Sequence, residues 1–81
     1  MPVDRDLERL ITSLAELAAR VRRIPATSAD DAVRLADEAE DIVEYAVTLR
    51  SKPAGMAVME ATAEVESIRE HVEALERTRG N

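Results

Sequence analysis

Apolar residues recur in alternating steps of four and three along three separate stretches of this sequence. In the first stretch they are Val3, Leu7, Leu10, Leu14, Leu17, Val21 and Ile24. In the second they are Ala32, Leu35, Ala39, Ile42, Ala46 and Leu49, and in the third Val58, Ala61, Val65, Ile68, Val72 and Leu75. This spacing keeps the apolar side chains on one face of an α-helix. The sequence therefore predicts three amphipathic helices, each of which must bury one face.

Capping and breaking residues set the expected limits of these helices at about residues 4–23, 29–50 and 54–78, in a single domain spanning 1–81. Pro25 ends the first helix, and Ser28 with Asp31 three residues later forms a variant of the capping box at the start of the second. Pro53 and Gly55 mark the next link. Short links of about five residues favour antiparallel neighbours. We expect an all-α, up-down-up three-helix bundle, or a helical oligomer in which the same faces pair between chains.

Two of the expected helices carry apolar residues outside the main face. Ile11, Ala15 and Ala18 widen the first helix, which is therefore expected to touch two neighbours. The second helix has a further row, interrupted only by Glu40, that consists of Ala29, Val33, Ala36, Val43 and Val47. We expect this helix to be wedged between the other two. Its acidic residues Asp30, Asp37, Asp41 and Glu44 would then face water.

Composition limits the possible partners and location of the chain. Its 81 residues include no Cys, Phe or Trp and a single Tyr, and 17 acidic residues outnumber 11 basic ones, giving a net charge of −6. A negative chain repels nucleic acid, and the basic cluster Arg20, Arg22 and Arg23 is expected to offset the dipole at the end of the first helix. No stretch approaches the ~18 apolar residues of a membrane span, and the first residues are too polar for a signal peptide. We expect a cytoplasmic protein with no membrane partner.

Several residues outside the main faces are candidates for an interface. Met56, Met59 and Ala63 recur at helical spacing and would either close one end of the bundle or form a patch for a partner. The second-row residues Val33, Val43 and Val47 complete the set of interface candidates. The Val-rich face of the third helix is typical of two-stranded coiled coils. These features favour a homo-oligomer or a subunit of a complex.

The residues with chemical potential are mainly carboxylates. His71 is the one histidine and is expected at the surface, so neither a zinc site nor a Ser-His-Asp set is predicted. We predict no catalytic, cofactor-binding or metal-binding residue from these patterns. Charged residues can form pairs within one helix, among them Glu16 with Arg20, Arg34 with Glu38, and Arg69 with Glu73. In a two-stranded coil, Glu64 could instead reach Arg69 of a partner chain, and His71 could reach Glu76.

One stretch resembles a known enzyme family. Residues 38–49, EAEDIVEYAVTL, resemble the second metal motif of MazG-type nucleotide pyrophosphohydrolases, in which Glu and Asp three residues apart hold magnesium. The upstream residues 13–19, SLAELAA, are similar to the framework of the first motif, although Ser13 and Ala19 stand where the family has acids. The resemblance implies Mg²⁺ as cofactor, Glu16, Glu38 and Asp41 as its ligands, and a nucleoside triphosphate as substrate.

The function expected first is a non-catalytic protein–protein interaction or assembly module that acts through apolar helix faces. The alternative is a diverged MazG-like pyrophosphohydrolase. A third hypothesis is an intertwined dimer that binds a small dicarboxylate, as chorismate mutases do, through Arg5, Arg22 and Arg34.

Overall fold

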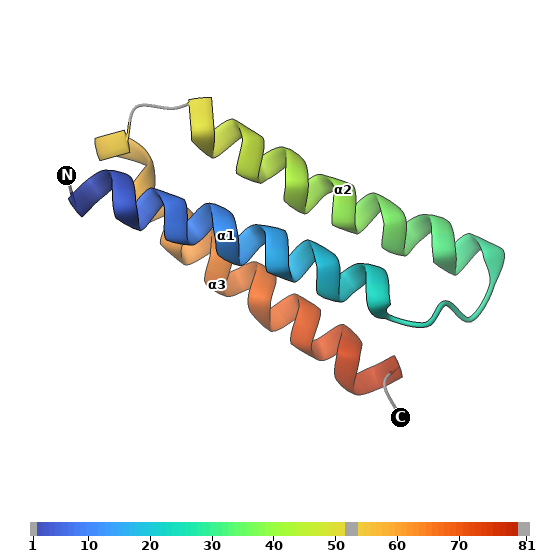
Figure 1. The fold of residues 1–81 in the computed structure, drawn as a ribbon. Coiled ribbons are helices and arrows are strands. Elements are labelled where there is room, and N and C mark those ends of the chain that lie inside the picture. Colours follow the sequence, from blue (N-terminus) through green and yellow to red (C-terminus); the bar gives the residue numbers. More distant parts are fainter. Residues whose placement is uncertain (1, 52–53, 80–81) are drawn as a thin grey trace.

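The computed structural model describes residues 2–51 and 54–79, with side chains described for residues 5–51 and 58–79. It contains helices α1 (Pro2–Arg23), α2 (Ala29–Ser51) and α3 (Ala54–Arg79), and these described ranges include no strand. Consecutive helices run in opposite directions (Figure 1). The expected all-α, up-down-up three-helix bundle is confirmed, and each helix begins and ends within two residues of its expected limit.

Local hydrogen bonds explain where α2 begins. The backbone N–H of Asp31 donates to Oγ of Ser28 at 3.1 Å, and the backbone N–H of Thr27 donates to Oδ2 of Asp31 at 2.9 Å. The first bond satisfies a donor that the first turn of a helix leaves unpaired, and the second ties the residue before the capping Ser28 to that turn. The predicted capping box is confirmed, with Thr27 rather than Ser28 as the donor to the Asp31 side chain.

The three apolar faces meet in one aliphatic core. Its buried members are Leu7, Leu14, Leu17, Ala18, Val21, Ile24, Leu35, Ala39, Ile42, Ala46, Leu49, Ala61, Val65 and Val72. Leu10, Ile11, Tyr45, Ile68 and Leu75 are partly buried against it. The expected face of α2 is wrong at Ala32, which is exposed, while the preceding residue Asp31 is buried. Asp31 is held inward because its carboxylate binds both Thr27 and Arg79.

The central helix of the bundle is α1. It packs along both α2 and α3, more extensively along α2, whereas the backbones of α2 and α3 come close at few positions (Figure 1). The expectation that the second helix is central is therefore wrong. The expectation that the first helix touches two neighbours is confirmed, because its leucines together with Ile11 and Ala18 cover a wide arc of its surface. The second apolar row of α2, from Ala29 to Val47, faces solvent.

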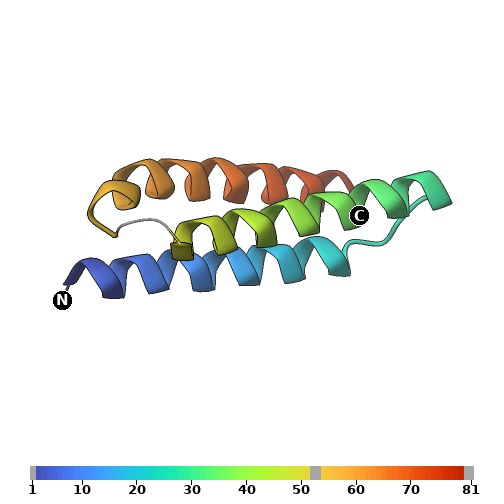
Figure 2. The same cartoon turned by 90° about the horizontal axis from the view of Figure 1, so that it is seen from above.

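The molecule is elongated along the helices, with principal extents of 44 × 20 × 15 Å (Figure 2). Most of its surface therefore consists of helix flanks, which are where the candidate sites lie.

Candidate functional site

An apolar strip runs along the exposed flank of α2. It consists of the five second-row residues Ala29, Val33, Ala36, Val43 and Val47, all of which are exposed. Val33 and Val47 are 61% and 63% exposed, and Val43 is 37% exposed. Exposed apolar side chains at helical spacing are typical of a helix that binds a partner, because burying them stabilises the interface. We call these five residues the α2 strip.

The methionine candidates lie on a different helix from the α2 strip. Met59 is 87% exposed and Ala63 is also exposed, so neither closes an end of the bundle, and the expectation of an end-closing role is wrong for them. The side chain of Met56 lies outside the described residues. Helical periodicity places Met59 on a different flank of α3 from Glu64 and His71, which face α2. The predicted interface residues thus occupy two separate surfaces.

A groove of about 460 Å³ separates α2 from α3. It is lined by Val21 of α1, by Glu38, Asp41, Ile42 and Tyr45 of α2, and by Glu64, Ser67, Ile68 and His71 of α3. Val21 and Ile42 are buried and Ile68 is half-buried, so the bottom of the groove is apolar. Three carboxylates stand along its sides. We call this site the acidic groove.

Tyr45 and His71 both lie close to carboxylates of the acidic groove. Burial raises the pKa of the Tyr45 phenol, and the nearby carboxylates of Glu64 and Glu60 raise it further because they disfavour a second negative charge. Nε2 of His71 lies 2.5 Å from Oε1 of Glu38 across the groove. The expected surface position of His71 is confirmed, since its side chain is 57% exposed.

The fold places two of the three residues that the MazG resemblance names as metal ligands in the same groove. Glu38 and Asp41 both line the acidic groove, whereas Glu16 is exposed on α1 and is not among the lining residues. Among the residues that the structure describes, no group of three or more His, Cys, Asp or Glu is placed to hold a metal ion. A magnesium site at Glu38 and Asp41 stays a prediction that rests on two carboxylates.

Ion pairs between helices tie α3 to the rest of the bundle. Nε and Nη2 of Arg20 donate to the two carboxylate oxygens of Glu76 at 3.0 and 2.6 Å, a bidentate arrangement. Arg79 binds Asp31 at the start of α2. The hydrogen bond from Arg79, followed by that from the Thr27 backbone, lowers the pKa of Asp31 to about 2, and the hydrogen bond from Arg20 lowers the pKa of Glu76.

These contacts replace most of the pairs expected within single helices. Arg20 binds Glu76 rather than Glu16, although the charge of Glu16 still acts on it. Glu38 contacts His71 rather than Arg34, and Arg69 binds Glu66 at 3.0 Å rather than Glu73. The three expected pairs are wrong in detail. Arg20 and Glu38 find partners on a helix packed alongside, which local spacing does not reveal, whereas Arg69 binds another carboxylate of its own helix.

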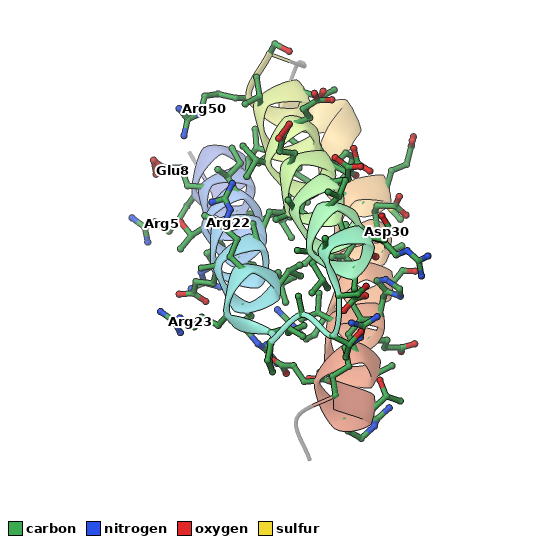
Figure 3. The ribbon with its side chains drawn as sticks, turned by 90° about the vertical axis from the view of Figure 1, so that its right-hand side faces the viewer. Arg5, Glu8, Arg22, Arg23, Asp30 and Arg50 are labelled. Carbon is green, nitrogen blue, oxygen red and sulfur yellow. The ribbon has the colours of Figure 1, made fainter. Side chains whose placement is uncertain are left out.

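The arginines proposed for a dicarboxylate site do not form a cluster. Arg5, Arg22 and Arg34 are all exposed. Figure 3 shows Arg5 and Arg23 projecting outward from α1, while Arg22 lies on the side of α1 near α2. Within the basic cluster, Arg20 binds Glu76, and all three arginines of the cluster lie in the last turn of α1, as expected. A dicarboxylate site at these residues stays a prediction without a supporting arrangement.

Sequence reasoning missed the contribution of α3 to the groove. Glu64 and His71 share a flank of α3 at a spacing of seven residues, as Glu38 and Tyr45 do on α2. That shared spacing is a signal present in the sequence, but pairing the two flanks requires knowing that α2 and α3 lie side by side.

Comparisons with known proteins return no relative. No family model matches the chain, no curated protein matches it, and no solved structure matches its fold. Among the described residues, none of the helices has a segment both long and apolar enough to cross a membrane.

Proposed function

We propose that this protein is an assembly module that associates with a helix of another protein chain through the α2 strip. The observation that carries this proposal is the row of apolar residues, with Val33 and Val47 more than 60% exposed, along a flank of α2 that no other helix covers within the described residues. A row at heptad spacing is the pattern by which one helix packs along another.

The small residues of the α2 strip favour close packing of that partner. Ala29 and Ala36 are seven residues apart and alternate with Val33, so a facing helix can approach the backbone of α2 at the alanines and contact the valines between them. Glu40 interrupts the row once. A single charged position within an apolar row selects the register and the partner at some expense of affinity.

Charge favours a second copy of this chain as the partner. The acidic residues of α2 are Asp30, Asp31, Asp37, Glu38, Glu40, Asp41 and Glu44, against Arg34 and Arg50. The basic residues of α1 are Arg5, Arg9, Arg20, Arg22 and Arg23, against Asp4, Asp6, Glu8 and Glu16, so α1 is slightly positive (five minus four, +1) and α2 strongly negative (two minus seven, −5). A pairing that places α1 of one chain opposite α2 of the other joins opposite charges around the apolar contact, which aids encounter and fixes orientation.

Oligomeric state tests the proposal directly. Light scattering coupled to gel filtration should show a dimer or larger oligomer for the wild-type chain. Val43→Glu with Val47→Glu should give a monomer with an unchanged far-ultraviolet circular dichroism spectrum, because both side chains are exposed in the single chain. Thr48→Glu with Thr62→Glu is the matched control, since it adds two charges at exposed positions outside the strip and should keep the oligomer.

Two results together would contradict the proposal. The first is a wild-type chain that stays monomeric at about 1 mM, where association is worth only about 4 kcal/mol. The second is a capture experiment from the native lysate in which the wild-type chain and the Val43→Glu, Val47→Glu variant retain the same proteins. A monomer that captures a protein which the variant loses would support the module with a different partner.

A further inference from the structure

We propose that the acidic groove between α2 and α3 binds a basic amphipathic helix of a partner protein. The first observation is the arrangement of the bundle. In a four-helix bundle each helix packs against two neighbours. Here α1 packs closely against α2 and α3, while α2 and α3 meet through the Glu38–His71 contact and leave a groove of about 460 Å³ between them. A helix laid in this groove would contact both.

The second observation is the order of polar and apolar groups across the groove. Ile42 and Ile68 lie at the bottom, with Glu38 and Asp41 on the α2 side and Glu64 on the α3 side. Apolar side chains flanked by carboxylates on both sides match a helix whose apolar stripe is flanked by Lys and Arg. The stripe would cover Ile68, which is half-buried above the buried Ile42, and the flanking cations would pair with Asp41 and Glu64 and compete with His71 for Glu38.

The third observation is the length of the site. The lining residues span Glu38 to Tyr45 on α2 and Glu64 to His71 on α3, about two helical turns or ~10 Å on each side. This extent suits two successive turns of a bound helix. Among the described residues, neither Asp41 nor Glu64 has an ion pair, so both carboxylates are available to a basic partner.

The acidic groove lies on a different flank of α2 from the α2 strip, because helical periodicity separates Asp41 and Tyr45 from Val33 and Val47 by about 80–160° around the helix. The inference therefore does not depend on the proposed association through the strip. A module with both sites could hold a basic helix while it remains assembled.

The chain carries its own reporters for this test. Tyr45 is the one aromatic residue and His71 the one histidine, and both line the groove. The probe is a synthetic peptide of about 18 residues, ~27 Å long as a helix, built from Leu, Ala, Lys and Arg so that it has no aromatic residue or histidine. Titration into the full chain should change the Tyr45 fluorescence and the ring-proton NMR shifts of His71. A peptide with Glu at every Lys and Arg position should cause neither change.

Variants separate binding in the groove from general attraction to an acidic protein. Asp41→Asn with Glu64→Gln should weaken binding about tenfold, the combined effect of two exposed ion pairs. Asp6→Asn with Glu8→Gln removes the same charge from exposed positions on α1 that lie about 20 Å along the helix from Val21, the α1 residue of the groove, and should weaken binding less than about twofold, because salt screens distant charges. The Val43→Glu, Val47→Glu variant should bind the basic peptide as the wild type does.

Any of three results would overturn the inference. These are no binding of the basic peptide, equal weakening by the groove variant and its matched control, or binding that leaves the signals of Tyr45 and His71 unchanged. Loss of peptide binding in the Val43→Glu, Val47→Glu variant would also overturn it, since the peptide would then occupy the α2 strip. Failure of the chain to self-associate would leave the outcome of this experiment unaffected.

Discussion

The two flanks of α2 differ in chemistry although they belong to the same helix. One flank carries the exposed α2 strip, which consists only of alanine and valine, and the other carries Glu38, Asp41 and Tyr45 in the acidic groove. Between them a third side, which includes Leu35, Ile42 and Leu49, is buried. The helix is therefore anchored along one side and presents two unlike surfaces. The residues that stabilise the bundle and the two surfaces proposed to bind partners therefore lie on separate sides of α2.

The largest effect on the free energy of unfolding should come from substitutions on the buried side of α2. Leu49→Ala removes a side chain that is 1% exposed and should lower the free energy of unfolding by about 2–5 kcal/mol, because it leaves a cavity in the core. Val47→Ala, two residues earlier on the α2 strip, should change it by less than about 0.5 kcal/mol. Urea unfolding followed by circular dichroism, at a concentration low enough for monomer, measures both. Equal losses would mean that the strip is packed within the single chain.

An intermediate effect on stability is expected from substitution at the start of α2, where Asp31 binds Arg79. The pKa of Asp31 is lowered from its ordinary 3.8 to about 2, so its ion pair stabilises the fold fully above the ordinary value. That stabilisation is lost as the pH falls from about 4 towards 2, where the folded carboxylate takes up its proton. Asp31→Asn should be less stable at neutral pH and should lose less stability over this interval, as measured by thermal unfolding at a series of pH values.

Asp30→Asn is the matched control for the acid experiment, because Asp30 is the preceding residue and is exposed. It should retain the wild-type dependence of stability on pH between about 4 and 2. If both variants follow the wild-type curve, the Asp31 pair does not contribute to the acid sensitivity of the fold.

The smallest effect on stability should come from the groove flank. Asp41→Asn removes an exposed carboxylate without an ion pair among the described residues, and should change the free energy of unfolding by no more than about 0.5 kcal/mol. Chemical denaturation measures the free energy of unfolding of this variant and of the control Asp37→Asn, in which an equally exposed carboxylate is removed. A large loss at Asp41 alone would show that this carboxylate maintains the fold, and the contrast between the buried side and the groove flank would then fail.

The sequence was sufficient to predict the helices and their buried faces, because heptad spacing and the capping residue Ser28 act within a few residues of one another. It was not sufficient to predict which helix is central. A second apolar row indicates that α2 has another face to cover, but periodicity does not show whether the cover is a helix of this chain or of a partner. Arg20 and Glu76 illustrate the same limit, since they are 56 residues apart and pair only after the bundle forms.

The candidate sites were predictable in part. The valines of the α2 strip were identified from the sequence as interface candidates, and the structure places them in solvent. The acidic groove was not foreseen as a site, because its two sides come from helices that share little direct packing. Glu38 and Asp41 were singled out for a different chemistry, and the residues facing them, Glu64 and His71, follow only from the tertiary arrangement.

The central position of α1 has a consequence for how the native state opens. Because α2 and α3 each pack on α1 and are joined to each other mainly by the Asp31–Arg79 and Glu38–His71 contacts, we expect that either outer helix can detach, once these contacts break, while the other stays in place. Native proteins commonly open in such partial units, each with its own free energy. Backbone amides of α1 would then exchange with solvent only through global unfolding, whereas those of α2 and α3 would exchange through two separate openings. A partner on the α2 strip would slow exchange in α2 alone, whereas a helix in the acidic groove would slow exchange in both outer helices.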